Sequence, residues 1–404
     1  MIPALLLCDD LKSLLDEAKK SNNNIIAKKI SKQSKQKEME SSKNAYYPTI
    51  DLNGFYQRYD KKNTFMSGTT YGGGATVGFD LYDGGKKYHT IKQKKYEFSS
   101  SDYQYKDTQK SIALLIVEDF YNIKTLISLL NAREDASKAV KAQLQRMQKF
   151  YDAKMATSDD VDRLQAAYDK NIYAIESLKF KILTLKQSLE LKVGREIDSF
   201  DNSKFKKIQD TDVTELDSIK ALTASKNSVL SKSETIDSIY YPQIRFQDSY
   251  TFYGYEDEPV IFNQPVEQLD KQNKLMATIN LRLIDFGVIS KQKEAIKLKA
   301  KALDEQILYK TKEQKMQQKL AKARIKTARL NIKTAKSAMK ASKSALETIT
   351  QKYNAGIVDN VVYLDALSSQ TESKATYEKS LNDLELAYAI YYYYNGKNIE
   401  DYLQ

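Results

Sequence analysis

Hydrophobic and polar residues follow a helical repeat in the second half of the chain, between residues 288 and 353. Apolar and small residues recur there at alternating steps of three and four positions. The members of this row are Ile325, Ala328, Ile332, Ala335, Met339, Ser342 and Leu346. A narrow row of this kind, in which every second member has a small side chain, is typical of a coiled coil whose helices approach closely. The pattern therefore predicts antiparallel helix packing within and between subunits.

The positions of glycine and proline predict helices of unusual length. No glycine or proline occurs in 86–193 or in 288–355, and these are the residues that most often interrupt helices. An uninterrupted helix over the second span would reach roughly 100 Å at 1.5 Å per residue. A compact globular domain does not accommodate such a helix.

Shorter segments alternate between apolar and polar residues, which is the repeat of a β-strand. The alternation is clear in 74–82 and 275–285, and weaker in the Tyr- and Phe-rich segments 49–59 and 243–253. About ten residues suffice for a membrane-spanning strand, although a half-buried strand of a soluble sheet shows the same pattern. Isolated hairpins are marginal in water, so we expect these strands to pair with copies from other subunits.

The order of motifs occurs twice along the chain. Each of three short motifs returns about 200 residues later. Tyr46-Tyr47-Pro48 returns as Tyr240-Tyr241-Pro242, Asp83-Gly84-Gly85 as Asp285-Phe286-Gly287, and Tyr151-Asp152-Ala153-Lys154 as Tyr353-Asn354-Ala355-Gly356. The sequence therefore predicts an internal two-fold repeat, with both halves built on one plan.

The predicted halves are 1–202 and 203–404, and each contains a helix, a strand pair and two long helices. In the first half, we expect a helix over 9–44, strands over 49–59 and 74–82, and helices over 86–153 and 158–193. In the second half, we expect a helix over 213–238, strands over 243–253 and 275–285, and helices over 288–355 and 361–394.

Composition argues against most classes of enzyme. The 404 residues include one cysteine and one histidine, so neither a disulfide within one chain nor a Cys/His metal cluster can form. A Ser-His or Cys-His pair would depend on His89 alone. We therefore expect no catalytic residues, no metal site and no cofactor.

The net charge of +11 favours anionic surroundings. A basic row lies beside the apolar row of 288–353, and no acidic residue occurs between Gln314 and Leu346. Its members are Lys315, Lys319, Lys322, Lys326, Arg329, Lys333, Lys336, Lys340 and Lys343. A solvated helix face is the commonest explanation, and a conduit lining or a track for a polyanion are alternatives. Without interleaved aromatic residues or a recognisable module, we expect no nucleic-acid partner.

The first eight residues contain a short apolar patch without the basic region and full length of a signal peptide. A trimmed signal and the start of the first helix both remain open explanations. Leu7 is a poor match to the small residue required before a lipidated cysteine, so lipidation of Cys8 is not favoured. No run of about 18 apolar residues predicts a transmembrane helix.

Together these motifs resemble the TolC-like outer-membrane efflux proteins. The resemblance rests on the repeated order, on the proline before each strand pair and on the Asp-x-Gly exit into each long helix. It also rests on Tyr353-Asn354-Ala355-Gly356 followed by Leu364-Asp365-Ala366, and it covers nearly the whole chain. It implies a mainly α fold with β, in which a homotrimer shares a twelve-stranded transmembrane β-barrel, four strands per subunit, continued by a long α-helical barrel.

The resemblance implies an outer-membrane channel of a tripartite efflux or type I secretion system. Such a duct passively conducts substrates from an inner-membrane transporter to the exterior, and a periplasmic membrane-fusion adaptor docks on it. The implied location is the outer membrane of a Gram-negative bacterium, in contact with its lipid and extending into the periplasm. Drugs, metal ions and secreted polypeptides all stay open as cargo. A soluble coiled-coil scaffold is the alternative function, and a polyanion-binding protein is a third.

The resemblance also implies a gate at the tips of the two helical hairpins. Well-known members of the family place two aspartates on the second inner helix, so that three subunits form two rings of carboxylates. This chain has Val362 and Asp365 at those positions, so only the ring of Asp365 is kept. The arginine that pins the closed tip in those members corresponds to Val358, and its partners correspond to Asp160 and Tyr353. The arginine is missing, so the family's lock is not expected here.

The same tips are where adaptors dock in the family, and the equivalent positions here are Ala156, Thr157, Gly356 and Ile357. Local chemistry offers a second role for this region. Gly356 suits a left-handed helix end, and Lys154 occupies the equivalent position in the first half. Helix capping explains Asp160 at least as well as gating does.

Overall fold

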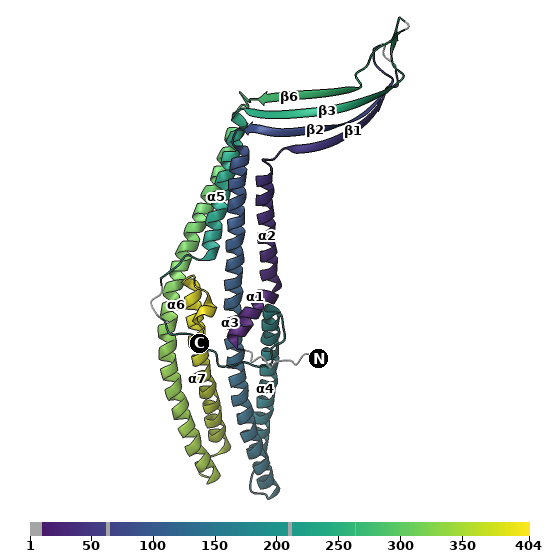
Figure 1. Cartoon of the computed structure of the whole chain (residues 1–404). Coiled ribbons are helices and arrows are strands. Elements are labelled where there is room, and N and C mark those ends of the chain that lie inside the picture. The colour runs from purple at the N-terminus through teal and green to yellow at the C-terminus, as the bar shows by residue number, and fades with distance from the viewer. Residues whose placement is uncertain (1–9, 62–64, 209–211, 263) are drawn as a thin grey trace. The chain divides into compact units, whose positions relative to one another are not determined.

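The computed structural model describes residues 10–61, 65–208, 212–262 and 264–404 (Figure 1). The fold is mostly helical with a small antiparallel sheet. Two compact units are present: unit 1 contains Met1–Lys29, Gln104–Ile219 and Tyr309–Gln404, and unit 2 contains Ile30–Tyr103 and Lys220–Leu308. Cys8 lies outside the described residues, so the expectations about its lipidation stay predictions.

Seven α-helices account for most of the described residues. They are α1 Leu11–Ser21, α2 Asn23–Asn44, α3 Lys86–Asp152, α4 Ser158–Val193, α5 Asp217–Asp237, α6 Val288–Asn354 and α7 Asn360–Tyr394, with short 3-10 helices at Ser238–Tyr240 and Ile399–Tyr402. Both α3 and α6 have 67 residues. Within the described part of the chain, no helix has the length and hydropathy needed to cross a bilayer.

The structure has two helices where the sequence predicts one over 9–44. Asn22 separates them: its backbone N–H still bonds to Ala18 of α1, whereas its side-chain oxygen accepts from the N–H groups of Asn24 and Ile25 at 2.9 and 3.2 Å. Its amide nitrogen also donates to the Lys192 carbonyl at 2.8 Å. An asparagine that caps a new helix while bonding to a distant one fixes the break.

Unit 2 contains a four-stranded antiparallel sheet in the order β1-β2-β3-β6 (Figure 1). The strands are β1 Thr49–Arg58, β2 Thr69–Asp83, β3 Gln243–Glu256 and β6 Lys271–Asn280. A separate two-residue pair joins β4 Val260–Ile261 to β5 Gln264–Pro265.

All four strands differ in extent from the sequence-based bounds, β1 and β3 only at their last residues and β2 and β6 by more. β2 starts at Thr69 because its glycine-rich beginning pairs with both β1 and β3, although it lacks apolar alternation. β6 ends at Asn280 because this residue pairs with Gln243, the first residue of β3. Pro242, the residue before Gln243, has no N–H with which to extend the hydrogen bonding between β3 and β6.

Unit 1 contains a layer of helices in the order α4, α3, α7, α6 (Figure 1). Asn382 of α7 donates to Thr125 of α3 at 2.9 Å, and Arg329 of α6 donates to the Tyr388 hydroxyl of α7 at 3.2 Å. Lys192 of α4 forms an ion pair with Asp119 of α3. α4 and α6 are therefore the two ends of this layer.

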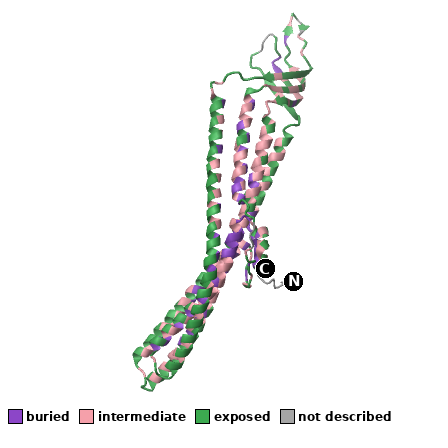
Figure 2. Cartoon of the chain, turned by 90° about the vertical axis from the view of Figure 1, so that its left-hand side faces the viewer, coloured by how far each residue is buried: buried purple, intermediate pink, exposed green. Residues whose placement is uncertain are grey.

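The core of unit 1 is concentrated at one part of the helical layer. Most of its buried residues come from α1, from 112–123 of α3, from the end of α4 and from 387–392 of α7, and α6 contributes Ala321 and Ile325. Figure 2 shows these residues in purple, whereas the hairpins beyond them are largely exposed. A smaller cluster within the hairpins joins Val140, Leu164, Tyr363 and Leu367. Ile325, Ala328 and Ala335 of the predicted coiled-coil row are buried.

Candidate functional site

The two faces of the sheet in unit 2 differ in chemistry. Strand register and the two-residue period place one set of side chains on each face. One face carries Ile50, Leu52, Tyr56, Ala75, Val77, Phe79, Ile244, Phe246, Tyr250, Phe252, Leu275, Ala277 and Ile279. The opposite face is mostly polar and also has an aromatic group formed by Phe55, Tyr253 and Tyr255. Its other members include Thr49, Asp51, Asn53, Gln57, Thr70, Gly72, Gly74, Thr76, Gly78, Asp80, Arg245, Gln247, Ser249, Thr251, Gln272, Lys274, Met276 and Thr278.

The apolar face is open to solvent in the single chain. Leu52 is 84% exposed and Leu275 is 70% exposed, and Phe252 and Ile279 are also exposed. Asp248, opposite Val77 and Leu275, is a charged residue within this face, and Arg58 and Lys271 lie on the same face toward the ends of β1 and β6. A contiguous exposed apolar surface of this kind marks contact with a lipid or a protein.

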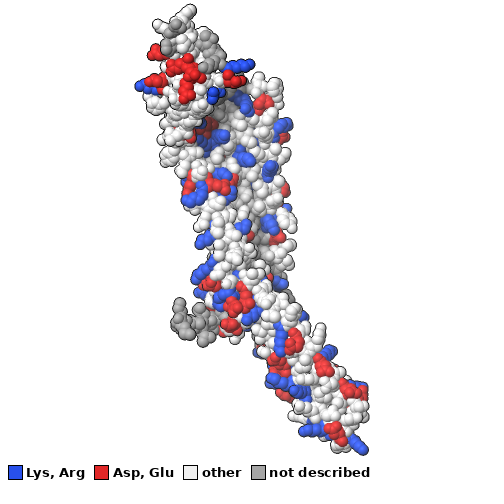
Figure 3. All heavy atoms as spheres, turned by 90° about the vertical axis from the view of Figure 1, so that its right-hand side faces the viewer, with Lys and Arg blue, Asp and Glu red and all other residues white. Residues whose placement is uncertain are grey.

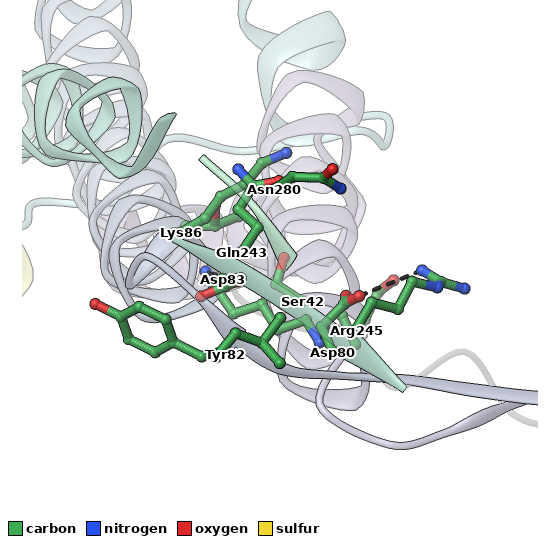
Figure 4. A pocket seen from close by; sticks show the side chains of 13 residues that line it. Ser42, Asp80, Tyr82, Asp83, Lys86, Gln243, Arg245 and Asn280 are labelled. Atoms are coloured by element: carbon green, nitrogen blue, oxygen red, sulfur yellow. Dashed lines mark hydrogen bonds and ion pairs between the residues drawn. The ribbon is translucent and has the colours of Figure 1, made fainter. Parts of the chain in front are cut away.

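A polar cavity lies where this sheet meets α2 and α3 within unit 2 (Figure 4). It has a volume of about 510 Å³. Asp80 forms ion pairs with Arg245 at 3.3 Å and with Lys87 of α3 at 3.2 Å. The Asp83 side chain caps the same helix by accepting from the Lys87 N–H at 2.7 Å. These bonds join the polar face of the sheet to the first turn of α3.

The α3–α4 and α6–α7 connections of unit 1 begin with the same turn. Lys154 has φ 62° and Gly356 has φ 72°, both in the left-handed region. The N–H of Met155 bonds to the Phe150 carbonyl, and the N–H of Ile357 bonds to the Lys352 carbonyl. This pattern satisfies carbonyls that a helix end leaves free. Glycine adopts it without strain, whereas Lys154 has a Cβ that disfavours it.

The helices that follow both begin with a side-chain cap. Thr157 caps α4, and Asp160 completes a capping box with it. Asp359 caps α7 by accepting from the Val362 N–H at 3.1 Å. Asp160, one of the two carboxylates of the predicted gate, therefore has a structural role at the N-terminus of α4.

Side-chain contacts also join the two hairpin tips to each other. The Asn360 amide nitrogen, in a side chain that is 4% exposed, donates to the backbone carbonyl and the Oδ1 of Asp160 at 3.3 and 3.4 Å. Arg146 of α3 donates to the Asn354 side chain at 2.6 Å. Arg146 and Asn360 belong to no motif or periodic row, so the sequence carries no signal for their role.

The predicted gate residues occupy two places. Tyr353 is half-buried in this tip, stacked on Tyr363 with ring centroids 5.0 Å apart, and burial raises the pKa of its hydroxyl. Asp160 lies close enough to raise that pKa further. Val358 is half-buried, and Val362 is exposed. Asp365 is exposed and lines a different hollow, of about 520 Å³, between α6 and α7.

The predicted docking positions lie at the ends of the two hairpins. Thr157, Gly356 and Ile357 are exposed, whereas Ala156 is half-buried. The other tip presents Met155, a large exposed apolar residue that belongs to no predicted site. Each tip therefore presents one prominent apolar side chain.

The basic row of α6 is exposed along its whole length. Ten lysines and arginines lie between Gln314 and Leu346, and all are exposed. Among the residues that the structure describes, none of these ten forms an ion pair, although ion pairs are frequent elsewhere in the chain. Figure 3 shows that, by contrast, positive and negative side chains are mixed on the face of unit 1 that carries α4.

Comparison with known proteins identifies relatives of this chain. Residues 14–194 match the outer membrane efflux protein family. The outer membrane protein TolC of Escherichia coli is 24% identical over 170 residues, which are 37% of this chain and 33% of TolC. The chain thus spans about a third of the curated relatives that it matches.

The fold matches those of known outer-membrane channels. The Campylobacter jejuni CmeC outer membrane channel has a TM-score of 0.83 at 14% identity, over 96% of this chain and 85% of that one. A membrane protein from Pseudomonas aeruginosa has a TM-score of 0.82 at 14% identity, over 96% and 93%. The sequence matches confirm the resemblance to TolC-like outer-membrane efflux proteins and the expected outer-membrane location. The family consists of channel proteins, not enzymes.

Proposed function

We propose that this chain, a TolC-like outer-membrane efflux protein, is the exit duct of a tripartite efflux or type I secretion system. Its role is passive conduction from an inner-membrane transporter to the exterior of a Gram-negative cell. The observation that carries the proposal is the four-stranded sheet with one polar face and one exposed apolar face. In a closed transmembrane barrel, the apolar face contacts lipid and the polar face lines the lumen.

Closure of the barrel needs further copies of the chain. β1 and β6 are the free edges of the sheet, and unpaired edges within a bilayer would leave backbone groups without hydrogen-bond partners. Three copies, each giving four strands, make the twelve-stranded barrel of the family. The proposed homotrimer pairs the two free edges and places the exposed apolar face against lipid.

The helices continue the duct as an α-helical barrel. Support for an internal two-fold repeat comes from matched lengths: 67 residues in both α3 and α6, and 36 and 35 residues in α4 and α7. We accordingly assign 1–202 and 203–404 as the two structural repeats. Their long helices form the wall between the barrel and the tips.

The gate of this duct lies at the hairpin tips. Asp160, Tyr353, Val358 and Val362 form the constriction together with Asp365, whose three copies would make one acidic ring. In place of the family's arginine, Asn360 bonds to Asp160 and holds the two tips together. The outer ends of the same tips dock the adaptor through Ala156, Thr157, Gly356 and Ile357.

Purification and conductance measurements test the duct. The expected result is extraction from outer membranes as a species of about three chain masses, which forms ion-conducting pores in planar bilayers. Recovery as a soluble monomer or dimer without conductance would overturn the proposal and favour the coiled-coil scaffold.

The gate has its own test within the same assay. Asp365→Ala should weaken cation block or alter ion selectivity, because three carboxylates near one axis attract cations. Asp162→Ala, which removes an exposed carboxylate from α4, is the matched control. Unchanged block and selectivity in Asp365→Ala would remove this residue from the gate.

A further inference from the structure

A large cavity of unit 1 is lined by α3, by α7 and by the segment 202–208 that follows α4. It has a volume of about 890 Å³, which is typical of sites for small organic ligands. Cations and carboxylates both lie in its lining: Lys124, Lys204, Lys206, Lys207, Glu378 and Glu385. None of them belongs to the proposed gate or to the docking positions.

A smaller hollow, lined by α6, adjoins this cavity. It has a volume of about 410 Å³, and Lys322, Lys326 and Arg329 belong to its lining. Ile208 lines both hollows. Arg329 also donates to the hydroxyl of Tyr388, which lines the larger cavity, at 3.2 Å. The two hollows are therefore neighbours, and together they are called the basic site below.

Positive charge exceeds negative charge in the basic site. Seven lysines and arginines line the two hollows, whereas the carboxylates in their described lining are Glu378 and Glu385. Glu385 already accepts a hydrogen bond from the Phe205 N–H at 2.7 Å. Lys204 and Lys326 are exposed, and within the described part of the chain neither forms an ion pair. An anionic ligand would balance charge that these residues leave unbalanced.

The half-buried lysine of the larger cavity also favours an anion. Burial lowers the pKa of Lys124, because the charged form is poorly solvated there. Its ammonium group donates to the Asp201 carbonyl at 3.0 Å and to the Asn202 side-chain oxygen at 2.8 Å, which holds it beside the segment 202–208. An anion in the cavity would stabilise the charged form of Lys124 by Coulomb attraction.

Apolar side chains form much of the remaining lining of the larger cavity. Ile208, Leu381 and Leu384 are half-buried, and they line the cavity together with the rings of Phe205 and Tyr388. A simple inorganic ion would leave this apolar surface in contact with water, whereas a ligand with an apolar body would cover it. The lining therefore favours an organic anion.

We propose that the basic site binds a multivalent organic anion. The apolar body of the ligand lies in the larger cavity, and its acidic groups contact the lysines of 202–208 and the cations of α6. The ammonium group of lysine is a compact point charge, so carboxylates, phosphates and sulfonates all suit this site. The inference concerns unit 1 of a single chain and does not depend on the proposed duct.

The basic site assigns a role to particular members of the basic row of α6. Lys322, Lys326 and Arg329 line the smaller hollow, whereas Lys336 and Lys343 of the same row line neither hollow. A merely solvated helix face would make all these cations equivalent toward an anion. Binding at the site should instead depend on the cations that line the two hollows.

Fluorescence titration of the full chain in a neutral detergent tests the proposal. The probe is pyrenetetrasulfonate, a water-soluble polyanion with a planar aromatic body. We expect saturable binding of one probe molecule per chain. Sulfate should displace the probe no better than chloride does at equal ionic strength, because sulfate has no apolar body. Absence of saturable binding, or stronger displacement by sulfate, would overturn the proposal.

Substitution of one lysine from each hollow locates the binding. Lys204→Ala with Lys326→Ala should weaken probe binding by at least about fivefold, because two exposed cations that pair with the anion are lost. Lys336→Ala with Lys343→Ala is the matched control, since it removes the same charge from exposed positions outside both hollows. An equal loss in the control would show general attraction to the basic row and would overturn the site.

Conservative and single variants separate charge from packing and test the extent of the site. Lys204→Arg with Lys326→Arg keeps both charges and should bind the probe nearly as tightly as the parent protein does. An arginine variant as weak as the alanine variant would show that charge does not determine binding, which would overturn the proposal. Lys204→Ala and Lys326→Ala alone should each lose part of the affinity. Unchanged affinity in either single variant would contradict a ligand that contacts both hollows.

Discussion

Replacement of Leu52 by arginine is the sharpest test of the proposal that the apolar face of the sheet contacts lipid. Leu52 lies on β1, is 84% exposed and pairs with Ala75 in the middle of the apolar face. An arginine on the lipid-facing side of a transmembrane barrel costs about 2–4 kcal/mol near the bilayer midplane. Because 1.4 kcal/mol changes an equilibrium constant tenfold, the folding equilibrium of each chain should fall by roughly 30- to 700-fold.

The neighbouring residue provides the matched control. Asn53 belongs to the same strand, pairs with Gly74 and points to the polar face. In the proposed barrel, Asn53→Arg places the same charge in the lumen, where we expect little change in stability. The two variants therefore differ in the face that carries the charge and are otherwise nearly equivalent.

Urea titration of folding into phospholipid vesicles measures the difference directly. Leu52→Arg should lower the free energy of unfolding by the amount given above, and Asn53→Arg should stay close to the parent protein. Equal stability of both variants would refute the assignment of the apolar face to lipid. A larger loss in Asn53→Arg would show that the faces are reversed.

Three further predictions concern unit 1. Gly356→Ala should destabilise the α6–α7 hairpin by about 1 kcal/mol, and Lys154→Gly should stabilise the α3–α4 hairpin by a similar amount, because the backbone at both positions is left-handed. Hydrogen exchange of the backbone amides at the tips measures both changes. A stabilising Gly356→Ala or a destabilising Lys154→Gly would contradict the strain argument. Asn360→Ala should raise the open fraction of single channels, since it removes the bond between the tips, and an unchanged fraction would exclude this bond from closure. Burial raises the pKa of Glu385, whose carboxylate accepts the Phe205 N–H at 2.7 Å. The folded state thus binds this proton more tightly than the unfolded state does, so the stability that it contributes is present below the ordinary pKa and is lost as the pH rises through the raised value. Glu385→Gln should therefore be more stable relative to the parent at pH 7 than at pH 4 in urea unfolding, and a pH-independent difference would contradict this assignment.

Much of the secondary structure can be predicted from the sequence because its signals are local. The absence of glycine and proline predicts the long α3 and α6, and the period of two predicts the strands of the sheet. The capping residues around Thr157 and Asp359 locate the beginnings of α4 and α7. These features depend on neighbouring residues, so no knowledge of distant contacts is needed.

The candidate site was less accessible to sequence reasoning. Asp160 was selected as a gate residue through the family resemblance, and the structure shows its capping role and its bond to Asn360. Arg146 gave no sequence signal because its partner, Asn354, lies more than half the chain away.

The sequence by itself determined the kinds of element, their approximate lengths and the chemical difference between the two sheet faces, because side-chain period and turn chemistry act over a few residues. Only the tertiary structure decided the break at Asn22, the end of β6 at Asn280, the contacts between the hairpin tips and the order of the helices in unit 1. Each of these depends on which distant segments pack together.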